Sequence, residues 1–447
     1  MRIYGAWAMI HYYLRLAMRR SCMQPAISLL VVLTMAIGVA ACMTTATIFR
    51  ALEGEPLPGI SDHLSVVTID AREKMVDGNP TYTTPDSLLK LRDAIALIDA
   101  HQASGQVALA QSYAQIGNPE REQSYIANGL MAYGAVFQVL GVPLRFGRPW
   151  SESELASHAP VALIDSDLAE KLFGTEDAVG RSVQMNTHRF RVIGVTAPWK
   201  PRIAFLGAAQ NMGGILASNT QLFIPIGAAL DAGLGPASSG ECDNGIAAVT
   251  FGTVDVQGCR WLEVWVSTTT PSAEAAYQSF LSNYAQGQHD AGRFVYPPQA
   301  ELYGTRAWMA LNHVVPNDVS LNLVFAGAFL LLCMMNVAGL LTARFLRRVA
   351  DVAIRRALGA SVRQIFEQHL IESGLLGLAG GVAALPLTWL GMWIVRKQPV
   401  GYAPIAQFSL SVFVGLAMLS LLVGMVVGIL PAWRVCKLPP AMQIKES

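Results

Sequence analysis

Three arginines, Arg355, Arg356 and Arg363, lie on a segment, residues 351–372, whose apolar residues recur at helical spacing. A guanidinium group keeps its charge at neutral pH and forms paired hydrogen bonds with carboxylates and phosphates. The pattern therefore predicts a basic amphipathic helix whose chemistry is non-covalent binding. Because short connections tie this helix to two apolar segments, it is either a lever between them or a plain juxtamembrane helix on anionic lipid, where each arginine contributes about 1 kcal/mol. The predicted apolar face consists of Ile354, Leu358, Val362, Ile365 and Phe366.

The sequence contains none of the following common motifs of catalytic sites. There is no glycine-rich phosphate loop of the form GxxxxGK[ST], so we expect the chain itself not to bind ATP. There is no HExxH motif and no cysteine–histidine cluster with zinc spacing, and the eight histidines are scattered. A nucleophile elbow for a Ser-His-Asp set is also missing. We therefore predict no catalytic residue, no metal site, no cofactor and no nucleic-acid partner.

The composition is typical of an integral membrane protein. Of the 447 residues, 53% are hydrophobic and 14% are charged, whereas a soluble domain has about 25% charged residues. A helix needs about 20 apolar residues to cross a bilayer, and four segments reach that length: 25–49, 319–343, 370–395 and 408–430. The polar segment 50–318 between the first two is long enough to fold around its own core.

Positive charge predicts how these four spans are oriented. The N-terminal segment 1–24, the loop 344–369 and the tail 431–447 are rich in basic residues, and four spans place all three on one side. Basic segments of this kind remain in the cytoplasm, so the large polar domain is predicted to be extracytoplasmic. Arg396 and Lys397 fall on the opposite side, where their long side chains can reach the lipid headgroups.

The N-terminal segment 1–24 predicts a helix that lies on the inner membrane surface. Trp7, Ile10, Leu14 and Met18 fall near one face at helical spacing, and arginines lie together on another face. The alternative is a disordered basic tail, which fits the aromatic content less well. In either case the segment is expected to contact membrane lipid.

A second reading exists for the first span. The stretch VAAC at 39–42 matches the small-residue pattern that precedes a lipidated cysteine in bacterial lipoproteins. The apolar run continues beyond it to Phe49, and the preceding segment is long for a signal peptide. A patch of small residues inside a membrane helix is therefore the preferred interpretation.

The segment 50–318 predicts an α+β domain. Apolar and polar residues alternate at 188–198 and 261–268, which is typical of strands. Segments 83–100 and 270–285 have capping residues followed by apolar residues at helical spacing. The predicted fold class is thus an α-helical membrane protein with four transmembrane helices and a large α+β domain between the first and second spans. A further strand is predicted at 64–70, and a strand followed by a helix at 160–174.

The loop and the third span resemble those of a known family. The stretch DVAIRRALGASVRQIFEQHLIESGLLGLAGGVAA at 351–384 closely resembles MacB/FtsX-type ABC transporter permeases, which typically read E-[IV]-[GA]-[IL]-R-[RK]-A-[LV]-G-A there. Asp351 stands where the family usually has glutamate. Stretches 137–154, 160–183 and 188–199 look like the family's periplasmic core domain. The similarity also includes the first span at 33–49 and the ending LPAWRVCKLPPAMQIKES at 430–447.

This resemblance implies a mechanism called mechanotransmission. Two permeases, a second copy or a relative, form a dimer in the bacterial inner membrane, and ABC ATPase subunits dock on their cytoplasmic loops. MacB has a fused ATPase, whereas here a separate ATPase subunit is expected. ATP-driven motion of the spans moves the periplasmic domains, and no substrate passes between the spans. By analogy the coupling helix that contacts the ATPase comprises Asp351, Ile354, Arg355, Arg356, Leu358 and Gly359, where glycine costs about 1 kcal/mol relative to alanine.

Three functions remain open within this family. The preferred one is export of a peptide, toxic compound or lipophilic molecule from the periplasmic side, with a periplasmic adaptor and an outer-membrane channel as possible partners. The second is an FtsX-like regulatory scaffold that controls a cell-envelope hydrolase. The third is Lol-like extraction of lipoproteins. Neighbouring genes distinguish them, because an ATPase beside an adaptor favours export and an amidase favours regulation.

The last prediction is a disulfide between Cys242 and Cys259. Of the six cysteines, only these two fall in the extracytoplasmic domain of the predicted topology, and the periplasm is oxidising. A single pair allows one intramolecular connectivity; the alternative is two unpaired thiols. The pair lies in or beside the segment 207–258, which is rich in Gly, Ala, Ser and Asn and predicts a flexible lobe or insertion.

Overall fold

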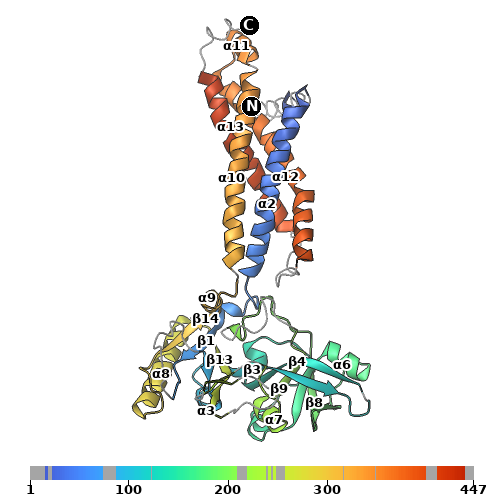
Figure 1. The fold of residues 1–447 in the computed structure, drawn as a ribbon, viewed down its shortest axis with the longest axis vertical. Helices are drawn as coiled ribbons and strands as arrows, with labels where there is room; N and C mark the ends of the chain where they lie inside the picture. Colours follow the sequence, from blue (N-terminus) through green and yellow to red (C-terminus); the bar gives the residue numbers. More distant parts are fainter. Residues whose placement is uncertain are drawn as a thin grey trace, which may run out of the picture. The chain divides into compact units, whose positions relative to one another are not determined.

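The computed structural model divides into two compact units. The helical unit comprises Met1–Glu53 and Pro316–Ser447, and the α+β unit comprises Gly54–Val315 (Figure 1). Each unit is considered separately below. The structure describes residues 16–18, 23–73, 87–121, 123–208, 219–237, 240–242, 245–247, 257–315, 317–347, 349–398 and 410–437.

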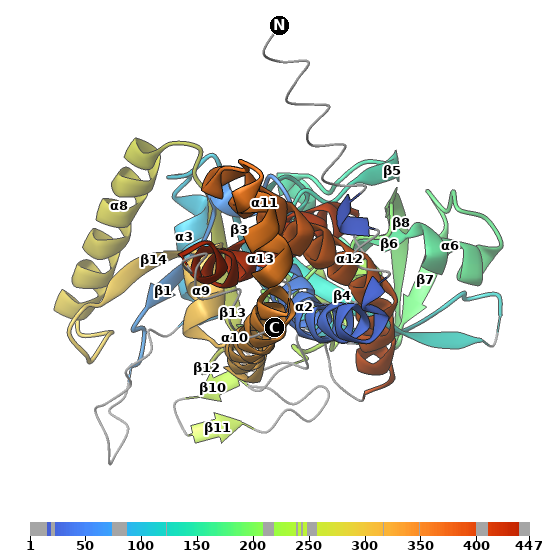
Figure 2. The ribbon, with the colours of Figure 1, turned by 90° about the horizontal axis from the view of Figure 1, so that it is seen from above.

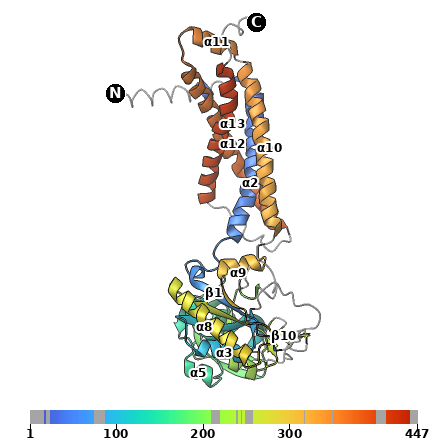
Figure 3. The ribbon, with the colours of Figure 1, turned by 90° about the vertical axis from the view of Figure 1, so that its left-hand side faces the viewer.

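Four long helices form the helical unit, and they lie side by side in two views (Figures 1 and 3). Three of them are long and apolar enough to cross a membrane: α2 (Pro25–Leu52), α10 (Asn317–Leu346) and α12 (Val362–Lys397). The fourth, α13 (Leu410–Lys437), contains the shorter apolar stretch Met418–Ile429. The structure thus has a helix at each of the four predicted spans, and three of these helices have the length and composition of a span.

Small residues allow these helices to approach closely, as is common in membranes. A Cβ atom added to Gly377 of α12 would lie 2.8 Å from the Cα atom of Gly424 on α13. Ser420 of α13 also donates a hydrogen bond of 2.5 Å to the Gly377 carbonyl. On α2, a Cβ atom at Gly38 would lie 2.9 Å from the Cβ atom of Cys333 on α10. The outward faces instead carry exposed large apolar side chains, which suits contact with lipid.

The basic segment between α10 and α12 contains a break at Gly359, where the cost of glycine in a helix already indicates a bend or close packing. A short helix, α11 (Val349–Ala357), ends before Gly359, whose φ of +97° lies in the left-handed region. Glycine adopts this conformation without the cost that a Cβ atom adds. Ser361 then caps α12 through a capping box with Gln364. The single amphipathic helix predicted over 351–372 is therefore wrong, because Gly359 and the Ser361 cap divide it in two.

The predicted interfacial helix at 1–24 lies almost wholly outside the described residues. The structure describes only 16–18 and 23–24 of it, and 16–18 are helical.

The α+β unit is built on one large mixed sheet. The strand order is β14-β1-β13-β3-β4-β9-β6-β8-β5, with β2 paired to β13 and β7 paired to β3 and β8. The β4–β9 and β6–β8 pairs are parallel, and the others are antiparallel. The strands are β1 (Leu64–Ile69), β2 (Leu88–Leu89), β3 (Gly105–Gly117), β4 (Ser124–Gly134), β5 (Leu144–Gly147), β6 (Val161–Asp165), β7 (Ser182–Met185), β8 (His188–Thr196), β9 (Leu222–Pro225), β13 (Leu262–Ser267) and β14 (Ala300–Gly304).

Buried side chains cover both faces of the sheet. One apolar cluster includes Trp261 and Val264, and a second includes Trp265, whose ring contacts Phe205 edge-on at 5.1 Å. Helix α8 lies at the end of the sheet near β1 and β14, and α6 lies at the opposite end near β8 (Figures 1 and 2). The helices are η1 (Ser61–His63), α3 (Leu91–Asp99), α4 (Val136–Val139), α5 (Glu152–Ala156), α6 (Ser166–Phe173), α7 (Ile226–Asp231), α8 (Pro271–Asp290) and α9 (Thr305–Leu311).

A disulfide joins Cys242 and Cys259 at the predicted lobe. The two cysteines are directly opposite each other in a small three-stranded sheet of order β11-β10-β12. Its strands are β10 (Gly240–Cys242), β11 (Gly245–Ala247) and β12 (Cys259–Arg260). The described part of the lobe therefore contains regular structure that is held to β12 by a covalent bond.

Candidate ATPase-coupling site

The predicted coupling residues divide between an outward face and an inward face of α11. Ile354 is 60% exposed and Leu358, directly after the helix, is 82% exposed. Val362, in the first turn of α12, is also exposed. Exposed apolar side chains surrounded by charge are typical of a protein contact or a membrane contact. The three residues, here called the apolar patch, come from one short stretch of backbone.

The rest of the predicted apolar face is not part of this patch. Ile365 is buried in the helical bundle, and Phe366 is half-buried against the same cluster. The residue that packs α11 onto the bundle is Val352, which shares a buried cluster with Phe345 of α10. Val352 is not part of the apolar face predicted from the sequence. That face assumes one continuous helix, whereas α11 is a separate helix that ends before Gly359 and can turn Val352 toward the bundle.

Two of the three arginines of the predicted basic helix are only partly exposed to solvent. Arg355 and Arg356 are half-buried, and Nη1 of Arg355 donates a hydrogen bond of 2.8 Å to Oε1 of Gln368 on α12. Arg363 is 87% exposed and pairs with Glu367 one turn later at 2.8 Å. Asp351 lies in α11, and its side chain is outside the described residues. The site therefore combines an apolar patch with positive charge at its border, and part of that charge also holds α11 to α12.

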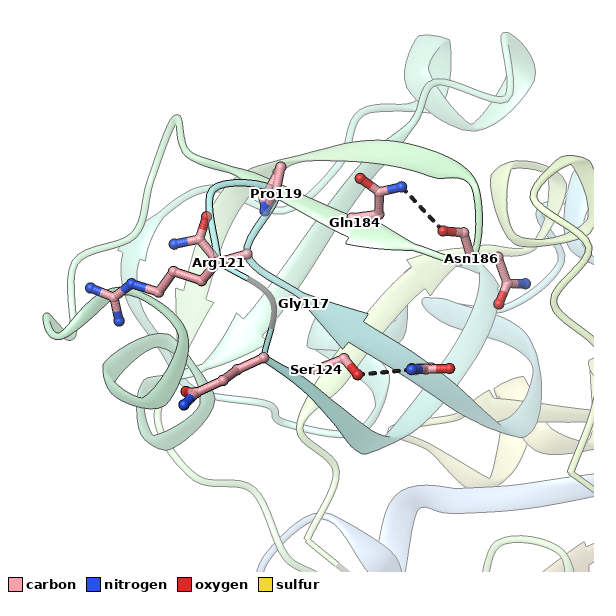
Figure 4. A pocket seen from close by; sticks show the side chains of 9 residues that line it. Gly117, Pro119, Arg121, Ser124, Gln184 and Asn186 are labelled. Atoms are coloured by element: carbon pink, nitrogen blue, oxygen red, sulfur yellow. Dashed lines mark hydrogen bonds between the residues drawn. The ribbon is translucent and has the colours of Figure 1, made fainter.

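The α+β unit offers two cavities that the sequence did not indicate. One, of about 280 Å³, lies between the β3–β4 and β7–β8 hairpins (Figure 4). In Figure 4 the Arg121 side chain extends away from the β3–β4 turn, while Gln184 and Asn186 come from the neighbouring hairpin. The cavity is lined by Gln115, Gly117, Asn118, Pro119, Arg121, Gln123, Ser124, Gln184 and Asn186.

The chemistry of this lining is hydrogen bonding. Most of the lining side chains are amides. Gln115 donates a hydrogen bond of 2.8 Å to the Ser124 hydroxyl, and Gln184 donates one of 3.3 Å to the backbone carbonyl of Asn186. None of the lining residues is a carboxylate, histidine or cysteine. The polar groups of the lining are thus amides, one hydroxyl and the Arg121 guanidinium, all of which can hydrogen-bond to a bound molecule.

The second cavity is more apolar. It has a volume of about 320 Å³, and Phe137 and Trp150 contact each other edge-on in its wall at 4.9 Å. His101 and Glu152 also line it. Within the described part of the chain, no group of three or more His, Cys, Asp or Glu side chains is placed to hold a metal ion.

A buried carboxylate lies in the middle of the large sheet. Glu263 of β13 is fully buried, and its Oε2 accepts hydrogen bonds from the Gly207 amide at 3.0 Å and from Nε1 of Trp265 at 3.1 Å. Burial raises the pKa of Glu263 to about 7, and these two hydrogen bonds lower it only in part. No cation pairs with Glu263 in the described residues. Its charge state therefore changes within the neutral range of pH.

A bundle of apolar helices in one chain with a large α+β domain inserted after its first helix defines a class: an integral membrane protein with a large domain between two of its candidate spans. Comparison with known families agrees with this class. A family model described as MacB-like periplasmic core domain matches residues 28–279, and one described as FtsX-like permease C-terminal matches residues 323–440. The chain belongs to the MacB/FtsX-type family of ABC transporter permeases.

Individual relatives share about a quarter of the aligned residues with this chain. The pyoverdine export ATP-binding/permease protein PvdT of Pseudomonas syringae pv. tomato is 25% identical over 375 residues, which is 82% of this chain and 50% of that protein. The macrolide export ATP-binding/permease protein MacB of Shewanella sp. is 22% identical over 430 residues, 92% of this chain and 57% of that protein. The chain spans about half the length of the curated relatives it matches. Among solved structures, the periplasmic region of MacB from Actinobacillus actinomycetemcomitans aligns with a TM-score of 0.35 and 16% identity, covering 58% of this chain and 96% of that one.

Proposed function

We propose that this chain is the permease subunit of an ABC export complex that works by mechanotransmission. A separate ATPase subunit would dock on α11 from the cytoplasm, and ATP-driven motion of the helical unit would move the α+β unit in the periplasm. The observation that carries this proposal is the apolar patch of Ile354, Leu358 and Val362, bordered by arginines. The similarity to export ATP-binding/permease proteins supports export as the task.

The surroundings of the complex belong to the same proposal. We place the chain in a bacterial inner membrane with four spans, of which α13 is the fourth, and with a second permease as its dimer partner. A periplasmic adaptor and an outer-membrane channel would carry the cargo onward. The cargo would be a peptide, toxic compound or lipophilic molecule, which meets the α+β unit and does not pass between the spans.

The spans themselves support transport outside the bundle. In the described helices, the ionisable residues of α12 with defined burial lie toward its ends, at Arg363 to Glu372 and at Arg396 and Lys397. Carriers that move ions through the membrane place such groups near the middle of a span. The proposed complex instead takes its energy from ATP hydrolysis in the partner.

We expect the purified 447-residue chain not to bind ATP, because the sequence has no phosphate-binding loop. Equilibrium binding of a fluorescent ATP analogue to the chain in detergent measures this, with a purified ABC ATPase as the positive control. Saturable binding to the chain alone would contradict the proposal.

Acidic substitutions in the apolar patch should prevent ATPase docking. The double variant Ile354→Asp/Leu358→Asp changes two side chains that make few contacts within the chain, so its free energy of unfolding should stay within about 0.5 kcal/mol of the original. Two carboxylates beside a partner's apolar surface would be buried without a counter-charge, which is costly. We therefore expect loss of co-purification of the ATPase subunit with the tagged chain.

The matched control is Ile126→Asp, which changes an exposed isoleucine on β4 of the α+β unit. This control should retain the ATPase subunit. Retention of the ATPase by the α11 double variant would show that the patch is not the docking site.

A further inference from the structure

A buried ion pair joins two helices of the helical unit close to α11. Arg344, two residues before the end of α10, is fully buried, and its Nη2 lies 2.8 Å from Oε1 of Glu372 on α12, which is also fully buried. Nη1 of Arg344 donates a hydrogen bond of 2.8 Å to the hydroxyl of Ser28 on α2. One guanidinium therefore connects α10, α12 and α2.

The same stretch of α12 is bonded to α11. Gln368 precedes Glu372 by four residues, so the two side chains lie on one face of the helix. Gln368 is buried, and its Oε1 accepts the 2.8 Å hydrogen bond from Arg355 of α11. Between them, the ring of His369 packs against Phe345 of α10 with centroids 4.2 Å apart. The hydrogen bond from α11 and the ion pair to α10 thus lie one turn apart on the same face of α12, and Arg344 extends the second of them to α2.

Stability alone does not explain two buried charges at this place. Apolar side chains of similar size often stabilise a buried site as well as an ion pair does, because desolvation of the charges is costly. A charged pair that is also hydrogen-bonded adds direction, since its strength depends on the alignment of donor and acceptor, which apolar contact does not require. Ionisable groups inside a membrane bundle are accordingly associated with function.

We propose that Gln368, Glu372 and Arg344 form a polar relay that transmits displacement of α11 to α10 and α2 as well as to α12. The relay rests on the proposed function, in which the ATPase acts on α11. These residues are positioning residues, since they lie inside the bundle and touch no nucleotide or cargo. Without the relay, α11 would still act on α10 and α12 through Val352 and the backbone, but the path through Arg344 to α2 would be lost.

The test is a double-mutant cycle in the full chain, without the ATPase, so that its outcome does not depend on where the ATPase docks. Gln368→Leu removes the bond between α11 and α12. Arg344→Met/Glu372→Met replaces the ion pair by apolar side chains, which keeps the interior filled and leaves no charge unpaired. Hydrogen exchange of the full chain in nanodiscs, measured by mass spectrometry, reports on the first turns of α2 and the last turns of α10.

We expect Gln368→Leu to speed exchange in these turns of α2 and α10 in the original chain, and we expect that increase to be lost in the Arg344→Met/Glu372→Met background. Equal increases in both backgrounds would overturn the relay. The matched control is Arg363→Met/Glu367→Met, which removes an exposed ion pair from the same helix. In that control background the effect of Gln368→Leu should persist.

A second variant keeps the test decisive if the double methionine variant does not fold. Glu372→Gln removes the charge and retains an oxygen that can accept from Arg344. The relay predicts a smaller but measurable response of α2 to Gln368→Leu in this background, and the full response of the original chain would overturn it. Failure of the proposed function has a different signature, since it appears as ATPase co-purification that is insensitive to the apolar patch.

Discussion

Removal of the Cys242–Cys259 disulfide should lower the free energy of unfolding of the α+β unit by about 3 kcal/mol. The bond closes a segment of 16 residues, and in the chain-entropy estimate a loop of about 15 residues is worth that amount. The loss should reach the core, because Cys259 is fully buried and lies three residues before Leu262, which pairs with Leu89 in the large sheet. Urea unfolding of fragment 54–315, followed by tryptophan fluorescence, measures the difference between the oxidised fragment and Cys242→Ala/Cys259→Ala.

The reduced, alkylation-free fragment is the control for the two substitutions. It has the original side chains and lacks only the bond, so its urea midpoint should match that of the double alanine variant. An unchanged midpoint in both would mean that the lobe unfolds independently of the sheet, and the assigned contribution to global stability would be wrong. Faster hydrogen exchange confined to residues 240–260 would accompany that result.

The helical unit could largely be predicted because membrane spans are specified by local composition. Each apolar run is long enough to make its own backbone hydrogen bonds, and no distant partner is needed to recognise it. The prediction was wrong at 351–372 because one glycine decides between a continuous helix and two helices. Gly359 is unfavourable inside a helix, and its left-handed backbone forms a local C-terminal cap in which the amides of Ala360 and Gly359 donate to the carbonyls of Arg355 and Arg356.

The buried ion pair could not be predicted, because the relative positions of packed helices are not encoded in local periodicity. Arg344 falls at the start of the basic loop 344–369 that orients the membrane domain, and Glu372 falls near the start of the predicted span 370–395. Their 2.8 Å contact depends on how α10 and α12 pack along their lengths. Close approaches of each helix to other neighbours, such as Gly377 of α12 to Gly424 of α13 and Gly38 of α2 to Cys333 of α10, fix these positions, and they are recognisable only when the helices are seen together.

In the α+β unit, strands were easier to predict than their faces. Residues 261–268 alternate in the sequence in a way that predicts one polar face, and the strand β13 does form there. Yet Glu263 and Trp265, which share a face, are both buried. Alternation implies a solvent-facing side only when one face of the sheet is uncovered, and here apolar clusters cover both. The order of the strands, including the parallel β4–β9 pair, likewise depends on contacts far apart in sequence.

Glu263 should make the stability of the α+β unit decrease as the pH rises. Burial raises its pKa in the folded state to about 7 from an ordinary value of 4.5, so the folded state binds the proton more tightly than the unfolded chain does. The stabilising contribution is complete below pH 4.5 and is lost as the pH rises through about 7. The difference between the folded-state and unfolded-state pKa values corresponds to a loss of about 3 kcal/mol in the free energy of unfolding across this range.

The variant Glu263→Gln should remove this dependence. Its amide oxygen can accept from the Gly207 amide and from Trp265, as Oε2 of Glu263 does, and it carries no charge at any pH. We therefore expect urea midpoints of fragment 54–315 to fall between pH 5 and pH 8 for the original sequence and to change much less for the variant. The matched control is Glu274→Gln on α8, an exposed carboxylate whose replacement should leave the original pH dependence. If Glu263→Gln and the original fragment lose stability equally over this range, Glu263 is not the titrating group, and the cause must lie with another side chain of the unit.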